Sequence, residues 1–295
     1  MFDSIEEIQQ SMEREKYICD RPLATVLYLA LKLEKPLLLE GEAGVGKTEV
    51  AKVMTQVLGR RLIRLQCYEG LDAASALYEW NYPKQLLRIK MTESRQQAPE
   101  ALNIFSEEFL IRRPLLEAIH DESEDRHIVL LIDEIDRSDE EFEAFLLEIL
   151  SDFQITIPEI GTIKAKHRPL VIVTSNRTRD IHDALKRRCL YHWIDYPSFE
   201  KEYKIVHSRV PAIQETLAHQ ICSFMQVIRG KDFYKKPGIA ETLDWANALI
   251  HLHKTHLDEG VVRETLGCIF KHFEDLKRMN EEDLNSCFNF LEQVP

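Results

Sequence analysis

The sequence has few of the features that mark secreted or membrane proteins. Its six cysteines are scattered, with no CxxC pair and no short-range framework, which indicates a reduced compartment rather than a set of disulfides. No apolar run approaches the length of a membrane span, and the acidic first residues lack the apolar segment of a secretion signal. We therefore expect a cytoplasmic protein without a membrane span.

Basic residues are also scarce relative to acidic ones. Fifty Asp and Glu residues against 38 Lys and Arg residues give a net charge of −12. Such a balance disfavours binding that depends on neutralising nucleic-acid phosphates, so no nucleic-acid partner is expected. The 295 residues are enough for one large or two ordinary domains, each with its own core.

The most informative stretch is Pro36 to Lys52, PLLLEGEAGVGKTEVAK. An apolar strand precedes its glycine-bearing turn and an amphipathic helix follows, which is the context that a phosphate-binding loop requires. Backbone N–H groups of such a loop surround a polyphosphate, the lysine reaches its oxygens and the hydroxyl holds magnesium. The predicted binding residues are Gly41, Glu42, Ala43, Gly44, Val45, Gly46, Lys47 and Thr48. An ordinary strand–turn–helix connection would leave the Lys47–Thr48 pair without a packing reason.

A second strand, in IVLLIDEIDR, ends in two acids, Asp133 and Glu134. In an open parallel sheet the ligand site lies at the carboxyl ends of the strands, where the phosphate loop also lies. Asp133 is the predicted magnesium-side residue, and Glu134 is the predicted general base that activates a water for nucleotide hydrolysis. The alternative is a strand that simply ends in solvated acids.

Three further polar residues follow a predicted β-hairpin at about 153–166. Asn176 comes after the apolar strand Leu170 to Thr174, where its amide either holds the attacking water or caps a turn. Arg187 and Arg188 come just before another strand. They form either an ordinary solvated surface or an arginine finger, including one that serves a neighbouring subunit.

Beyond residue 197 the alternation of strands and helices stops. We predict an α/β nucleotide-binding domain over 1–197, with a parallel sheet flanked by helices, and a smaller all-helical lid domain over 198–295. The helices expected in the lid are Phe199–Arg209, Ile213–Ile228, Ile239–His253, Val261–Phe273 and Glu282–Leu291.

Other groups allow more than one interpretation. The aromatic residues Tyr68, Tyr78, Trp80 and Tyr82 form either a local core cluster or a surface for a partner. The polar segment Met91 to Ser106 is expected to be an exposed, irregular insertion. Of His251, His253 and His256, only the last two have a spacing that suits joint metal ligation, and solvated histidines are the simpler interpretation.

Taken together, the phosphate loop, LLIDEID, the hairpin, TSN and RRC followed by a helical lid resemble an AAA+ ATPase of the branch that contains the MoxR family. The stretches EGEAGVGKTEVAK, QCYEGLDAASALYEWNYPKQLL and PGIAETLDWANAL resemble CoxD-like proteins, which are associated with carbon monoxide dehydrogenase maturation. The resemblance covers roughly residues 17–253.

This resemblance implies a Mg-ATP-hydrolysing chaperone that assembles as a ring, usually a hexamer. Such chaperones often act with a von Willebrand factor A domain protein, and the client here would be a metalloenzyme with a molybdenum-copper site. Asn176 matches the sensor amide, Arg188 matches the trans arginine finger, and Arg187 is the second choice. Many AAA+ lids carry an arginine near the start of the helix after the lid glycine, whereas this chain has Glu241 and Thr242 there.

Two other functions remain compatible with the same module. One is a nucleic-acid motor or loader, against which the acidic balance argues. The other is a nucleotide-switched scaffold with little turnover.

Overall fold

A computed structural model describes residues 2–94, 103–120 and 128–291. The chain divides into two compact units. The first comprises Met1–Ile8, Arg21–Glu40 and Thr48–His192, and the second comprises Gln9–Asp20, Gly41–Lys47 and Trp193–Pro295. The phosphate loop is thus grouped with the C-terminal helices, and the predicted domain boundary between residues 197 and 198 stays a proposal.

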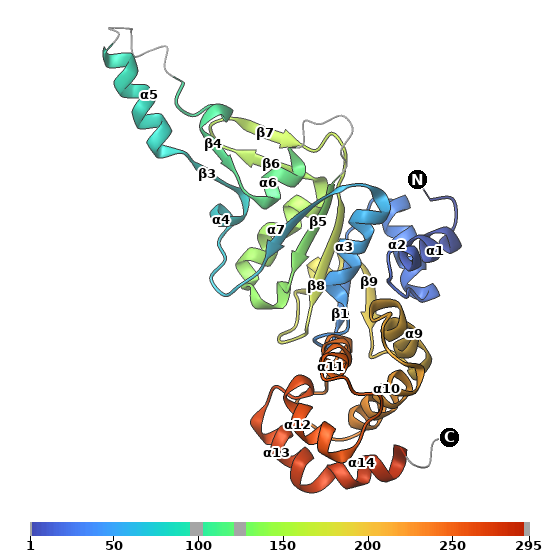
Figure 1. Ribbon diagram of the computed structural model, residues 1–295. Coiled ribbons are helices and arrows are strands. Elements are labelled where there is room, and N and C mark those ends of the chain that lie inside the picture. Colours follow the sequence, from blue (N-terminus) through green and yellow to red (C-terminus); the bar gives the residue numbers. More distant parts are fainter. Residues whose placement is uncertain (1, 95–102, 121–127, 292–295) are drawn as a thin grey trace. The chain divides into compact units, whose positions relative to one another are not determined.

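Most of a five-stranded parallel sheet, with the strand order β2-β5-β8-β1-β9, belongs to the first unit (Figure 1). Its strands are β1 (Leu37–Gly41), β2 (Arg61–Gln66), β5 (Ile128–Asp133), β8 (Leu170–Ser175) and β9 (Leu190–Ile194). Every residue of β5 and β8 is buried, as expected for central strands covered on both faces. The predicted fold class is therefore confirmed. Strand register places Gln66 beside Asp133, so the polar ends of β2 and β5 meet.

Helices and strands contribute about equally to the core of this unit. Leu115 and Leu116 from α6, and Phe142 and Leu146 from α7, pack with Leu130 of the sheet in one apolar cluster. Gly59, with φ of 62°, follows α3 in the left-handed conformation that is common at helix ends. The helices are α1 (Ile5–Arg14), α2 (Arg21–Leu33), α3 (Lys47–Leu58), α6 (Pro114–Ile119), α7 (Glu140–Asp152) and α8 (Asp183–Arg188), with a 3-10 turn η3 (Ile135–Arg137).

Two small antiparallel sheets extend the first unit (Figure 1). The predicted hairpin is present as β6 (Gln154–Ile157) and β7 (Gly161–Lys164). The other sheet belongs to an insertion made of α4 (Ala73–Leu77), β3 (Tyr78–Trp80), α5 (Tyr82–Ser94), η2 (Glu107–Phe109) and β4 (Leu110–Arg112). The prediction of an irregular segment from Met91 was wrong for 91–94, which continue α5, and 95–102 lie outside the described residues.

The aromatic residues of this insertion divide into two groups. Trp80 is buried and stacks edge-on against Tyr78 and Phe105, with ring centroids 6.0 and 5.2 Å apart. Tyr68 and Tyr82 are exposed. The core interpretation therefore holds for Trp80, while Tyr68 and Tyr82 lie outside the core.

The C-terminal part of the second unit is helical. It contains α9 (Phe199–Arg209), α10 (Glu215–Arg229), α11 (Ile239–His251), α12 (Glu259–Ile269), α13 (Phe273–Arg278), a π-helical turn η4 (Met279–Asp283) and α14 (Leu284–Leu291). Its core surrounds Trp245, whose indole N–H donates to Thr265 Oγ1 at 2.8 Å. The predicted helix from Val261 to Phe273 was too long, because Phe270 is extended and packs its buried ring 4.8 Å from that of Phe233.

No helix among residues 2–94, 103–120 and 128–291 is long and apolar enough to cross a membrane.

Candidate nucleotide site

The phosphate loop, Gly41–Lys47, connects β1 to α3. Gly44 and Gly46 have φ of 78° and 97°, which side chains rarely tolerate, so the loop's curvature depends on glycine at both positions. The buried ammonium of Lys47 donates to the carbonyls of Gly41 at 2.8 Å and Glu42 at 2.6 Å. The lysine charge is therefore held against the backbone of the loop, where phosphate oxygens are expected to bind.

Asp133, at the carboxyl end of β5, is the most heavily hydrogen-bonded acid of the first unit's site. Its Oδ1 accepts from Thr48 Oγ1 at 3.0 Å and from Thr174 Oγ1 at 2.5 Å. Its Oδ2 accepts from Arg64 Nε at 3.1 Å and Nη2 at 2.5 Å. The side chain is buried, so these bonds compensate for the loss of hydration. The structure thus brings together Thr48 and Asp133, the two oxygen donors predicted for magnesium, a donor set that suits this hard cation.

Glu134 has an unusual backbone, with φ of 56° in the left-handed region. Such a conformation costs about 1–3 kcal/mol in a residue other than glycine and persists only where neighbours hold it. The Glu134 N–H donates to Thr174 Oγ1 at 2.9 Å. Its carboxylate accepts from Gln66 Nε2 at 3.0 Å and from Asn176 Nδ2 at 3.4 Å. The predicted base and the predicted sensor amide are therefore in contact.

Asp136, the last acid of LLIDEID, fixes the loop that carries Asn176. Its buried carboxylate accepts from the N–H of Asn176 at 3.1 Å, and from the N–H and hydroxyl of Thr178 at 2.9 and 2.7 Å. The position of Asn176 is thus set through its backbone, which leaves its side-chain amide directed to Glu134.

Five residues of this arrangement were not identified from the sequence: Arg64, Gln66, Thr174, Asp136 and Thr178. Arg64 and Gln66 lie on β2, which pairs in parallel with β5. A polar residue at the carboxyl end of a parallel strand was the available signal for Gln66 and Thr174.

The two predicted arginines lie on the short helix α8 and are exposed. Arg188 donates to Ala184 O at 3.1 Å and to Ser151 Oγ on α7. The start of α8 is anchored by Glu143 of α7, whose buried carboxylate accepts the N–H of His182 at 2.7 Å and pairs with Arg179. Within the described chain, Arg188 has no hydrogen bond to Asp133, Glu134 or Asn176.

Cys67 follows Gln66 and donates its N–H to the Asp133 carbonyl at 2.9 Å. Burial raises the pKa of its thiol to about 12, and the charges of Asp133 and Asp136 act in the same direction. The thiol is therefore protonated at neutral pH, which argues against a nucleophilic role.

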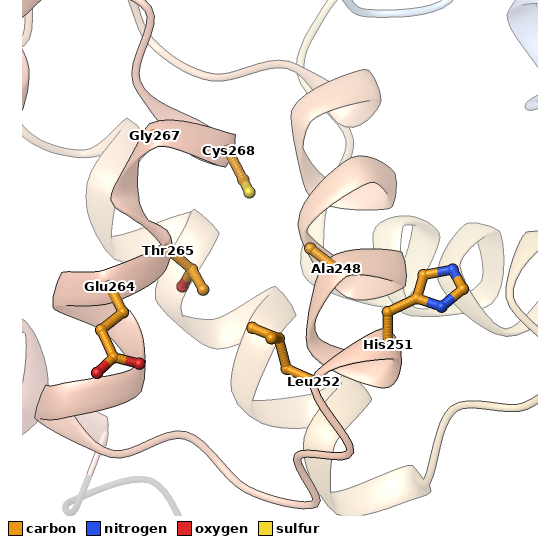
Figure 2. A pocket seen from close by; sticks show the side chains of 7 residues that line it. All are labelled: Ala248, His251, Leu252, Glu264, Thr265, Gly267 and Cys268. Atoms are coloured by element: carbon orange, nitrogen blue, oxygen red, sulfur yellow. The ribbon is translucent and has the colours of Figure 1, made fainter.

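The three histidines considered as metal ligands lie at and after the end of α11. All are exposed, and His253 and His256 belong to the connection after the helix. His251 borders a pocket of about 410 Å³ between α11 and α12, into which Leu252 and Cys268 point while the His251 ring points away (Figure 2). Across the described ranges, no three His, Cys, Asp or Glu side chains are grouped as metal ligands would be.

A parallel sheet with a phosphate loop after β1 and an acidic pair at the end of β5 defines a P-loop nucleotide-binding fold. The family model of the AAA domain (dynein-related subfamily) matches residues 36–189. The chain belongs to this family and is an AAA+ ATPase. Nucleotide binding, usually with Mg²⁺, is a property of the AAA+ class, and its members commonly assemble as rings.

Relatives among curated proteins are themselves uncharacterized. A protein of Staphylococcus epidermidis is 26% identical over 262 residues, which span 86% of this chain and 90% of that protein. One of Staphylococcus haemolyticus is 27% identical over 227 residues, 75% of this chain and 77% of that protein. Among solved structures, the Thermotoga maritima RuvB Holliday junction branch migration motor is similar at 17% identity and a TM-score of 0.45, covering 96% of this chain and 82% of that one.

Proposed function

We propose that this protein is a Mg-ATP-hydrolysing chaperone of the MoxR type that remodels or matures a client metalloenzyme. The observation that carries the hydrolytic part is the contact of Glu134 with Asn176 beside the Thr48–Asp133 pair. This arrangement has the parts that hydrolysis of a bound nucleotide requires, namely a metal-side acid, a base and an amide that orients it. The CoxD-like sequence stretches support a client with a molybdenum-copper site, as in carbon monoxide dehydrogenase.

Each site residue has a proposed role in this reaction. Residues 41–48 bind the phosphates of ATP, with Lys47 supplying the charge, and Thr48 and Asp133 hold Mg²⁺. The cation, when bound, would stabilise negative charge on the phosphate oxygens. Glu134 accepts the proton of the attacking water, while Gln66 and Asn176 keep its carboxylate in one orientation. Asp136 acts indirectly, because it fixes the Asn176 loop.

We also propose that the protein forms a hexameric ring in the cytoplasm. In this ring Arg188 of one subunit is the arginine finger for the nucleotide bound to the neighbouring subunit. Its exposure and its attachment to α7 through Ser151 suit a rigidly presented arginine at a subunit surface. Arg187 on the same helix is the second choice. A von Willebrand factor A domain protein is the proposed accessory partner.

Client contact is proposed for the exposed apolar residues of α5. This helix extends away from the five-stranded sheet (Figure 1) and exposes Tyr82, Leu86, Leu87 and Met91. Large apolar side chains gathered on a surface mark interaction sites, and a remodelling chaperone needs a surface that holds apolar segments of its client. We name these four residues the α5 patch.

The double variant Leu86→Ser/Leu87→Ser is expected to lose client capture while its basal ATPase rate stays near that of the wild type. Both side chains are about 60% exposed, at 58% and 60%, so their loss removes contact area without opening a cavity in the core. Client capture is measured by affinity capture from a lysate of the source cells, with Glu134→Gln added to both proteins so that ATP is retained. Bound proteins are identified by mass spectrometry. The ATPase rate is measured without Glu134→Gln.

The matched control for this experiment is Phe273→Ser on α13, which removes a 73%-exposed apolar side chain outside the α5 patch. Equal capture by the double variant and the wild type would remove the α5 patch from the proposal. Loss of ATPase activity in the double variant would instead show that α5 supports the fold.

The nucleic-acid motor remains the second candidate, because the same nucleotide-binding module supports it. The net charge of −12 argues against it. Clear stimulation of the ATPase by DNA or RNA at moderate salt would reverse the preference.

A further inference from the structure

A turn of the helical region lies directly against the phosphate loop within the second unit. The N–H groups of Ile239 and Ala240, which open α11, donate to the Gly44 carbonyl at 3.0 and 3.2 Å. A β-carbon on Gly238 would lie 2.7 Å from both the carbonyl carbon and the oxygen of Gly44. The Pro237–Gly238 turn and the loop are therefore in close contact, and the orientation of the Gly44 peptide is fixed.

This orientation bears directly on phosphate binding. In a trans peptide the N–H of Val45 points opposite to the Gly44 carbonyl. Holding that carbonyl toward α11 consequently fixes the Val45 N–H on the other side of the peptide. A phosphate loop binds its anion through such N–H groups, so a fixed peptide orientation retains the nucleotide better than a mobile one.

The turn itself is held by a buried arginine from the preceding helix, α10. Arg229 Nε donates to Pro237 O at 2.8 Å, and its Nη2 donates to Gly238 O at 3.3 Å. The remaining hydrogen bonds of the guanidinium include a bidentate pair to Glu202, at 2.6 and 2.7 Å. Glu202 is fully buried and also accepts from Thr242 Oγ1 at 2.6 Å.

At the start of α11, where many AAA+ lids carry an arginine, this chain has Glu241. Glu241 accepts the N–H of Gly238 at 2.9 Å, so its carboxylate supports the same turn. A buried arginine, Arg229, lies one helix earlier, and its charge is paired with Glu202.

We infer that Arg229, held by Glu202, is a positioning residue that acts through the Pro237–Gly238 turn on the peptide of Gly44 and thereby sets how long nucleotide stays bound. The inference rests on nucleotide binding at the phosphate loop. The Arg229–Glu202 pair thus controls nucleotide exchange and has little effect on the hydrolytic step.

Two variants test the inference from opposite sides of the contact. Arg229→Lys keeps the charge but loses the fork that reaches both carbonyls of the turn. Gly238→Ala leaves the ion pair intact and adds a methyl group against Gly44, and its φ of −85° is ordinary for alanine. The readout is the rate of dissociation of a fluorescent ADP analogue, N-methylanthraniloyl-ADP, by stopped flow, together with single-turnover ATP hydrolysis.

Each single variant is expected to release the ADP analogue about tenfold faster, the size of effect that one or two lost hydrogen bonds produce. The double variant should be no faster than the faster single one, because both act through the same peptide. Single-turnover hydrolysis at saturating ATP should stay close to the wild-type rate. Arg263→Lys, an exposed arginine paired with Glu259, is the matched control and should change nothing.

Wild-type release from folded Gly238→Ala, or multiplied effects in the double variant, would overturn the inference. If circular dichroism shows that Arg229→Lys is not folded, the release rate of Gly238→Ala tests the inference by itself, because this variant leaves the buried ion pair unchanged. Absence of analogue binding by the wild type would overturn both this inference and the proposed function, whereas equal release rates would overturn this inference alone.

Discussion

Glu134→Gln is expected to lower ATP hydrolysis by about 10²- to 10⁴-fold, the usual contribution of a positioned general base. Glutamine has nearly the same shape as glutamate but does not accept the proton of the attacking water. Because Glu134 has no contact with the phosphate loop among its hydrogen bonds in the described chain, ATP affinity should change little. Phosphate release and equilibrium binding of a fluorescent ATP analogue measure the two quantities.

The control for this variant is Glu140→Gln, which removes an exposed carboxylate at the start of α7. It should hydrolyse ATP at the wild-type rate. Hydrolysis by Glu134→Gln at that same rate would show that the base is another residue.

Arg188→Ala is expected to lower hydrolysis about 10³-fold, the lower end of the effect of an arginine finger, with ATP binding retained. In the structure Arg188 is bonded to Ser151 and Ala184 rather than to Asp133 or Glu134, which fits a residue that serves a different subunit. Its truncation should therefore leave its own subunit's phosphate loop intact.

A mixing experiment distinguishes sharing between subunits from action within one subunit. Arg188→Ala supplies an intact loop, and Lys47→Ala supplies an intact Arg188, so a mixture should recover part of the activity that each lacks alone. If Arg187→Ala loses activity while Arg188→Ala keeps it, the finger is Arg187. No recovery in mixtures that are shown to co-assemble would contradict sharing.

The parts of the site that the sequence revealed are those set by local order along the chain. The phosphate loop is contiguous, and Asp133 and Glu134 end an apolar strand, so local patterns were enough to find both. Arg64 and Gln66 were missed because their role depends on β2 lying beside β5, a pairing that connects residues 68 or 69 positions apart. Sequence order does not specify strand order in a parallel sheet.

The prediction of where α12 ends was wrong for a related reason. Periodicity continues through Phe270, but that ring packs against Phe233 from a different part of the chain, and the backbone becomes extended to let it do so. The buried Arg229–Glu202 ion pair could not be predicted either, because nothing in the sequence around two charged residues on separate helices indicates that they are buried. Tertiary contacts determined each of these features.

ATP hydrolysis at the phosphate loop is tested most directly by steady-state phosphate release from the purified full-length protein with Mg-ATP, compared with Lys47→Ala. Phosphate release by the wild type should depend on added Mg²⁺ and should be lost in Lys47→Ala, whose loop lacks the ammonium held by Gly41 and Glu42. If the wild type binds ATP but hydrolyses it no faster than Lys47→Ala, the protein is not a hydrolysing chaperone, and a nucleotide-switched scaffold is favoured.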